Sequence, residues 1–332
     1  MIRVAYASYS HAGNSRSEDK YHSQRPDRMA TRDFTVGMVF LSENIVGILG
    51  NISLLYHYLF LHFTGCRLRS TDLIVEHLPV ANTLAMLSTG IPSAVAAFGW
   101  KHFLSDIGCK LAYYIHRVAS GVSIGTTCLL SVFQAITISP RNSRWAELKV
   151  KAPKYIGFSI FLCWILQLLI NIIFTLYVTG NRSNKHVTKK KDLGLCSTVI
   201  HDRIRVLVNV GLLLFPDVSC LGLMVWTSGF MVFILYRHKQ QVQHLHRTDI
   251  SPRASAESRA TQSILVLAST FVSLYTLSSI FHIYLVLSNN PSWWLVNSSV
   301  LITTCFPTVS PYILMCHDHR VSTFFFAWIR IR

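Results

Sequence analysis

The stretch YIGFSIFLCWILQLLINIIFTLYV, residues 155–178, runs for 24 residues without one Asp, Glu, Lys or Arg. A helix needs about 20 apolar residues to cross a hydrocarbon core that is roughly 30 Å thick. Backbone amides in lipid must be hydrogen-bonded within the segment, and a barrel strand is far shorter than this run. The stretch therefore predicts a membrane-spanning helix.

Similar apolar runs occur on both sides of it. The six others cover residues 36–63, 74–99, 111–138, 206–236, 262–287 and 293–315. The last two are also free of Asp, Glu, Lys and Arg. The sequence thus predicts an all-α membrane protein, a bundle of seven transmembrane helices, with no internal repeat.

The composition excludes most other classes. The 332 residues are 51% hydrophobic and only 14% charged, whereas a soluble domain carries about 25% charged residues. The net charge of +16 fits contact with anionic lipid headgroups and requires no nucleic acid. We expect the lipid bilayer to be the main solvent of this chain.

The segments outside the spans are short and polar. We expect an extracellular tail at 1–33, a domain of seven transmembrane helices at 34–315 and a cytoplasmic tail at 316–332. Residues 1–33 lack the apolar core of a cleavable signal peptide, so the first span is expected to act as the targeting signal. No part outside the membrane is large enough for an enzyme domain.

Lys and Arg are evenly divided between the two sides, so their distribution leaves the orientation open. The loop at 179–205 decides it, because it holds the sequon Asn181-Arg182-Ser183 and Cys196. Both features suit the oxidising exterior. We therefore predict a multi-pass plasma-membrane protein with an extracellular N-terminus, a cytoplasmic C-terminus and a glycan at Asn181.

Eight cysteines are too few for a disulfide framework in a chain of this length. Cys109, at the outer start of the third span, and Cys196 are the two cysteines placed to meet on the oxidising side. We expect them to form a disulfide that holds the outer loop across the mouth of the bundle.

Two patterns that resemble a catalytic site and a metal site have simpler explanations. Gly121-Val122-Ser123-Ile124-Gly125 matches a nucleophile elbow, but that chemistry needs a strand-to-helix turn. The same glycines form G-x-x-x-G, which lets two membrane helices approach closely. Cys316, His317 and His319 lack metal-site spacing. We expect neither an enzyme nor a cofactor.

Three long strings carry a family resemblance. They are SVFQAITISPRNSRWAELKVKAP at 131–153, FPDVSCLGLMVWTSGFMVFILYRHKQ at 215–240 and CFPTVSPYIL at 305–314. Residues 29 to about 320 resemble the vomeronasal type-1 receptors, a branch of the seven-helix G-protein-coupled receptors. The resemblance implies detection of pheromone-like small molecules and signalling through an inhibitory-class heterotrimeric G protein.

The chain departs from the large rhodopsin-like class at three places. Phe133-Gln134-Ala135 stands where that class has an acidic-Arg-aromatic triplet, so its ionic latch is missing. Ser310-Pro311-Tyr312 replaces the Asn-Pro-x-x-Tyr pattern, and the second span carries Asn82 where a carboxylate is usual. A sodium site of the usual kind is therefore not expected.

Ionisable groups inside a membrane are costly and call for an explanation. Arg117 lies eight residues below Cys109, and Asp217 follows Pro216 in the fifth span. Two interpretations stay open, an interhelical ion pair and a ligand contact.

The candidate ligand residues lie in the outer half of the bundle. Helical spacing places those of the third span on one face, opposite residues of the fifth, sixth and seventh spans. The set is Tyr113, His116, Arg117, Ser120, Asp217, Phe281, His282 and Asn297. We expect a small, mainly hydrophobic ligand that carries an acidic or carbonyl group for Arg117.

The inner surface supplies the candidate G-protein contacts. They are Gln134, Arg141, Arg144, Trp145 and Lys149. The alternatives are a bitter-taste-like receptor, a small-solute transporter and an intramembrane hydrolase. A transporter predicts inverted repeats, and a hydrolase needs catalytic residues at matching depth, neither of which we find.

Overall fold

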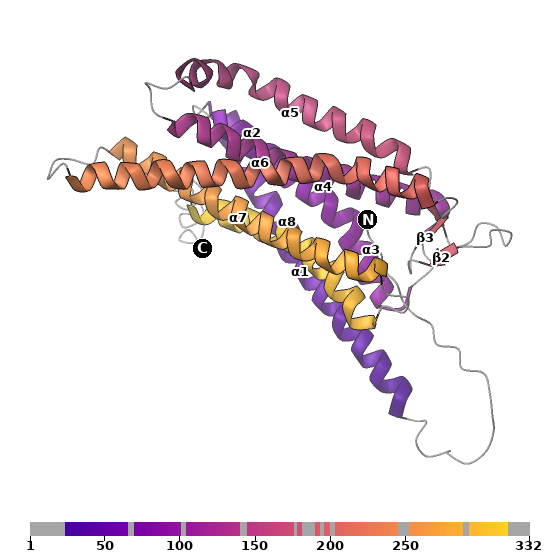
Figure 1. Ribbon diagram of the computed structural model, residues 1–332. Coiled ribbons are helices and arrows are strands. Elements are labelled where there is room, and N and C mark those ends of the chain that lie inside the picture. Colours follow the sequence, from indigo (N-terminus) through magenta and orange to yellow (C-terminus); the bar gives the residue numbers. More distant parts are fainter. Residues whose placement is uncertain are drawn as a thin grey trace, which may run out of the picture.

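The computed structural model describes residues 24–65, 70–100, 104–139, 145–175, 178–180, 190–192, 196–199, 203–244, 252–287 and 292–317. Within these residues, seven helical segments are long and apolar enough to cross a membrane. They overlap the seven predicted runs, which confirms the seven-helix prediction (Figure 1).

In the described part of the chain, the spans are formed by nine helical elements. These are α1 (Gln24–Phe63), α2 (Ser70–Ala85), η1 (Met86–Gly90), α3 (Ile91–Ala97), α4 (Asp106–Ile138), α5 (Trp145–Thr175), α6 (Arg203–His244), α7 (Pro252–Leu287) and α8 (Trp293–His317). The second span is built from α2, η1 and α3. Its middle section η1 is a turn of π-helix, which widens the helix locally.

Several helices extend beyond the apolar runs that predicted them. α1 begins at Gln24, 12 residues before the predicted start at 36. α5 likewise begins at Trp145, 10 residues before the predicted start at 155. Polar residues continue a helix as readily as apolar ones, so hydropathy locates the part in lipid and misses the polar ends.

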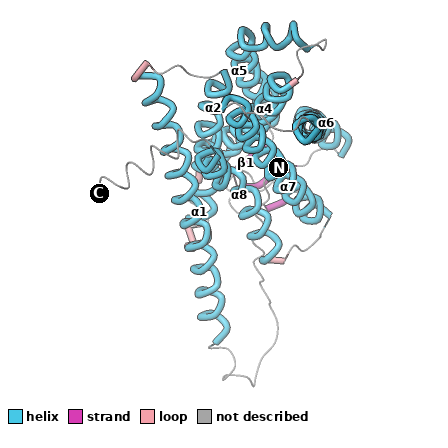
Figure 2. The backbone as a smooth tube through the Cα atoms, turned by 90° about the vertical axis from the view of Figure 1, so that its left-hand side faces the viewer, coloured by secondary structure: helices cyan, strands magenta, loops and turns pink. Residues whose placement is uncertain are grey.

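α4 lies at the centre of the bundle. It packs against α2, α5, α6 and α7, and Figure 2 shows it surrounded by these helices. Every residue from Gly121 to Cys128 is buried. A helix that is buried on all sides can contact most of the other spans, which makes α4 the common support for the polar contacts described below.

The G-x-x-x-G pattern of α4 serves helix packing. A methyl group at Gly121 would meet the side chain of Gln167, and one at Gly125 would meet Sγ of Cys163. Both neighbours belong to α5. The two glycines therefore bring the α4 and α5 backbones close together, as the sequence predicted.

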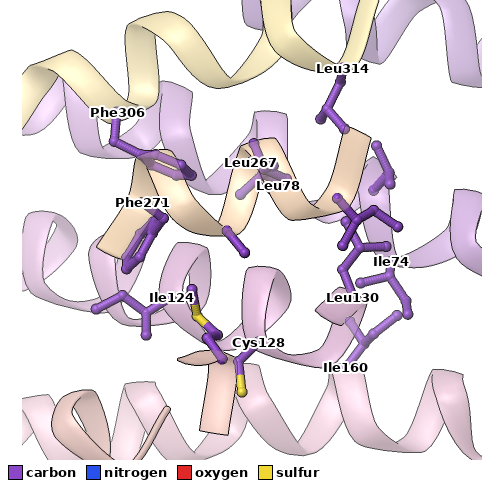
Figure 3. Close-up of a cluster of buried hydrophobic side chains, with 14 of the residues drawn as sticks. Ile74, Leu78, Ile124, Cys128, Leu130, Ile160, Leu267, Phe271, Phe306 and Leu314 are labelled. Carbon is purple, nitrogen blue, oxygen red and sulfur yellow. The ribbon is translucent and has the colours of Figure 1, made fainter. Parts of the chain in front are cut away.

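The largest hydrophobic cluster lies inside the bundle and takes residues from α1, α2, α4, α5, α6, α7 and α8 (Figure 3). Phe271 of α7 and Phe306 of α8 meet edge to face with ring centroids 4.4 Å apart. On α5 and α6, large apolar side chains such as Phe158 and Trp226 are exposed by 63% and 76%. Such an exposed apolar surface fits lipid contact.

A small antiparallel sheet follows α5, where the sequence predicted a loop. It consists of β1 (Val178–Gly180), β2 (Lys190–Asp192) and β3 (Cys196–Val199), in the order β1-β3-β2. β1 contacts α4, so the sheet marks one end of the bundle, here called the sheet end. Strands of three or four residues are too short to show an alternating pattern.

Cys109 lies in the first turn of α4, at the sheet end of the bundle. Its side chain is fully buried and disulfide-bonded. In the sheet, Cys196 pairs with Gly180 of β1. The side chain of Cys196 lies outside the described residues, so the Cys109–Cys196 bridge stays a prediction.

Candidate functional site

Polar side chains of α4 contact other helices at three levels along its axis. The first level, near the sheet end, centres on Arg117. The second centres on Ser123 and the third on Gln134. Because 17 residues separate Arg117 from Gln134, the levels span about 26 Å of helix, close to the thickness of a hydrocarbon core.

Arg117 forms an ion pair with Asp217 of α6 at the first level. The distance from Nη2 of Arg117 to Oδ2 of Asp217 is 3.5 Å, and the side chains are 12% and 3% exposed. The hydroxyl of Tyr275 on α7 donates to the same carboxylate oxygen over 3.0 Å. Nε of Arg117 donates to Oδ1 of Asn171 on α5 over 3.4 Å. The group thus joins four spans.

The charges in this group are matched, one cation to one anion. A buried charge that loses its partner is strongly destabilising, so each of Arg117 and Asp217 requires the other. Of the two interpretations left open by the sequence, the structure contains the interhelical pair. Tyr275 and Asn171 were not predicted, because neutral polar residues are frequent in these spans and give no local signal.

The other predicted ligand residues lie partly near Arg117 on α4 and partly in a separate cluster. On α4, Oγ of Ser120 and Nε2 of His116 are 3.3 Å apart, and Tyr113 lies one turn from Arg117. Phe281 of α7 packs on a separate cluster with residues of α1, α3 and α8.

The predicted residues at the ends of α7 and α8 are not joined to Arg117 by contacts among the described residues. Asn297 is buried and donates to the carbonyl of Trp293 in its own helix, over 2.9 Å. The side chain of His282 lies outside the described residues.

A neutral hydrogen-bond network forms the second level. Nδ2 of Asn82 donates to Ser310 over 2.8 Å, and Ser123 donates to Oδ1 of Asn82 over 2.8 Å. Asn82 also donates to Asn51 over 3.3 Å, and Asn51 donates to the Pro307 carbonyl over 2.8 Å. The network links α1, α2, α4 and α8 with uncharged groups.

The third level lies at the end of the bundle opposite the sheet. Nε2 of Gln134 donates to Oγ1 of Thr261 on α7 over 2.8 Å, and both residues are buried. Gln134 was predicted to face a G protein, but in this conformation it faces α7. Lys149 is partly exposed on α5. Arg141, Arg144 and the side chain of Trp145 lie outside the described residues.

Comparison with known proteins shows which family the chain belongs to. A profile of the Vomeronasal organ pheromone receptor family matches residues 34–327. The chain belongs to this family. Vomeronasal type-1 receptor 4 of Homo sapiens is 58% identical over 302 residues, which cover 91% of this chain and 100% of that protein.

Two further relatives support the assignment to the vomeronasal receptor family. Vomeronasal type-1 receptor 2 of Homo sapiens is 55% identical over 297 residues, 90% of this chain and 74% of that protein. Vomeronasal type-1 receptor 90 of Rattus norvegicus is 36% identical over 290 residues, 86% of this chain and 92% of that protein. Members of this family are receptors and not enzymes, which sets aside the hydrolase and transporter alternatives.

Proposed function

We propose that this chain is a chemosensory receptor for a small, mainly hydrophobic signal molecule such as a pheromone. The ligand binds in the half of the bundle near the sheet, and the opposite end activates an inhibitory-class heterotrimeric G protein. The observation that carries the proposal is the Arg117–Asp217 group, which connects four spans at one level. A ligand that contacts this group reaches all four helices at once.

The matched charges limit the chemistry of the ligand. Asp217 already neutralises Arg117, so an ionised ligand would bring an uncompensated charge into a low-dielectric site. An uncharged molecule with a carbonyl, ether or hydroxyl oxygen accepts a hydrogen bond from Arg117 and keeps the balance. Tyr113, His116, Ser120, Phe281, His282 and Asn297 are the proposed further contacts.

The proposed orientation places the sheet end outside the cell. The sequon at Asn181 and the disulfide-bonded Cys109 both suit an oxidising compartment. The N-terminus is then extracellular and the C-terminus cytoplasmic. Arg141, Arg144, Trp145 and Lys149 consequently belong to the G-protein-facing surface.

A screen of uncharged ketones, esters and alcohols against matched carboxylates and amines tests the ligand class. Cells expressing the receptor with an inhibitory-class G protein report activation as nucleotide exchange. The uncharged compounds should include the strongest agonist. A panel in which only ionised compounds activate would contradict the matched-charge argument.

The position of the site is tested with the same agonist. The double variant Arg117→Gln/Asp217→Asn removes both charges and leaves none unpaired. Since a hydrogen bond to a charged group is worth about 1.5–3 kcal/mol, the half-maximal concentration should rise at least about tenfold. Lys110→Ala, at the sheet end of the same helix, is the control. An unchanged response at equal surface expression would overturn the assignment.

A further inference from the structure

We propose that Glu43 is the main ligand of a monovalent cation, which binds where α1, η1 and α8 meet in the half of the bundle near the sheet. The site is separate from the Arg117–Asp217 group, so its test is independent of the proposed function.

Glu43 carries a charge for which the structure supplies no counter-charge. Both of its carboxylate oxygens are buried and lack a hydrogen-bond partner within the described part of the chain. The ion pairs in that part are Arg117–Asp217 and Lys151–Glu147, so Glu43 has no cationic partner there. An isolated carboxylate in an apolar environment is costly. A bound cation removes this cost because it neutralises the charge.

The neighbours of Glu43 on α8 do not satisfy the carboxylate. It lies beside the Thr304 hydroxyl and the Cys305 thiol. The Thr304 hydroxyl donates to the carbonyls of Val300 and Leu301 in its own helix, over 3.1 Å each, and a thiol is a weak donor. The hydroxyl oxygen of Thr304 keeps lone pairs that a cation can use.

A further unsatisfied oxygen belongs to the residue that follows Glu43. Asn44 is 3% exposed, and its Nδ2 donates to the Phe40 carbonyl over 2.7 Å. Its Oδ1 is buried without a hydrogen-bond partner and lies against Gly90 of η1, where a methyl group would overlap it. About one turn further along α1, a methyl group at Gly47 would meet side chains of both η1 and α8. The three elements therefore converge around these oxygens.

The oxygens fit a small monovalent cation. Carboxylate, carboxamide and hydroxyl oxygens favour hard cations. One carboxylate balances one positive charge, so a divalent ion would leave an excess charge in an apolar site. The described residues contain no group of three His, Cys, Asp or Glu side chains that could hold a metal ion, which disfavours zinc. Glu43 is then the main ligand, with Asn44 and Thr304 as further ligands. An alkali ion and the ammonium group of a small amine share this chemistry.

The cation site is distinct from the neutral network of the second level. Asn51, the α1 member of that network, lies eight residues from Glu43, or about 12 Å along the helix. Asn51 and Asn82 are already hydrogen-bonded to each other and to α8. A cation held by Glu43 and Thr304 would bridge α1 and α8 nearer the sheet, and it would stabilise the folded bundle in proportion to its occupancy.

Thermal unfolding of the purified full-length protein in neutral detergent micelles tests the site. Sodium or butylammonium replaces N-methylglucamine, a bulky cation, at constant ionic strength. The bound cation should raise the melting temperature of the parent protein by about 2 °C at roughly five times its Kd. Glu43→Gln keeps the shape of the side chain and removes its charge, so it should abolish the shift.

Matched variants separate the site from a general effect of salt. Glu147→Gln makes the same change at an exposed glutamate that is paired with Lys151 on α5, and it should keep the shift. Thr304→Val removes one proposed ligand at almost unchanged volume. It should raise the half-saturating cation concentration about fivefold, as expected for the loss of one neutral polar contact.

The source of the cation is read from the same measurement. A shift with sodium assigns the site to an inorganic ion, and a shift with butylammonium alone assigns it to the amine group of an organic molecule. Either result supports the site if Glu43→Gln loses the shift. The absence of a shift in the parent protein with both cations, or an equal shift in Glu43→Gln, would overturn it.

Infrared spectroscopy tests whether a proton neutralises Glu43 instead. At neutral pH and the highest sodium or butylammonium concentration, the parent protein and Glu43→Gln should absorb equally in the carbonyl-stretch region of protonated carboxylic acids. A band that is present in the parent protein and missing from Glu43→Gln would show that Glu43 carries a proton, and it would contradict the cation site.

Discussion

Arg117 and Asp217 are ionisable residues in surroundings that disfavour charge. Each carries a charge within an apolar span, and the structure pairs them at 3.5 Å. Both were singled out from the sequence, because charges inside spans are rare enough to be noticed one by one. Their neutral partners Asn171 and Tyr275 were not, because which polar side chains meet across the bundle is decided by helix packing and not by local sequence.

The ion pair leads to a prediction about stability. Arg117→Met alone should lower the free energy of unfolding by about 3–5 kcal/mol, because it leaves the Asp217 carboxylate buried without its partner. Arg117→Met with Asp217→Leu should recover most of the loss, since no buried charge remains. Thermal unfolding of the purified protein in detergent micelles measures both. A double variant as unstable as the single one would show that the charges are not each other's main partners.

At the scale of the helices, apolar runs located all seven spans, and G-x-x-x-G predicted a close contact for α4. The partner of that contact could not be predicted, because the pattern does not say which helix lies opposite. The π-helical turn at Met86–Gly90 and the helical start of α1 at Gln24 also escaped prediction. Hydropathy shows which residues lie in lipid. It does not show where a helix changes its hydrogen-bonding pattern or how far it continues beyond the membrane.

The α4–α5 contact gives a prediction with an internal control. Gly125→Ala adds a methyl group against Sγ of Cys163 and should cost about 1–3 kcal/mol as overpacking. Gly157→Ala on α5 meets nothing within 4 Å and should be neutral or slightly stabilising through helix propensity. Melting temperatures in micelles compare the two variants. Combining Gly125→Ala with Cys163→Ala should restore stability, and equal melting temperatures for the single variants would contradict the close contact.

The whole molecule is a seven-span membrane protein whose class is evident from composition and from three long family strings. Its orientation was harder to derive, because Lys and Arg are balanced across the membrane and only the loop holding Asn181 and Cys196 breaks the balance. The small sheet in that loop was not foreseen. Its order β1-β3-β2 depends on contacts between short segments, which single-sequence patterns do not encode.

The proposed orientation has a direct test in intact cells. Endoglycosidase treatment should increase the gel mobility of the parent protein, and neither Asn181→Gln nor Ser183→Ala should show that increase, because both variants destroy the same sequon. An epitope inserted beside Asn181 should be reached by antibody without permeabilisation. An epitope reached only after permeabilisation would reverse the topology, and with it the sides assigned to ligand and G protein.

α7 carries no glycine or proline after Pro252, so its sequence contains none of the residues at which helices usually kink. Phe271 meets Phe306 of α8 edge to face, and Tyr275 lies one turn further along α7, about 6 Å away. The packing against α8 and the hydrogen bond to Asp217 are thereby carried by neighbouring turns of one unbroken helix.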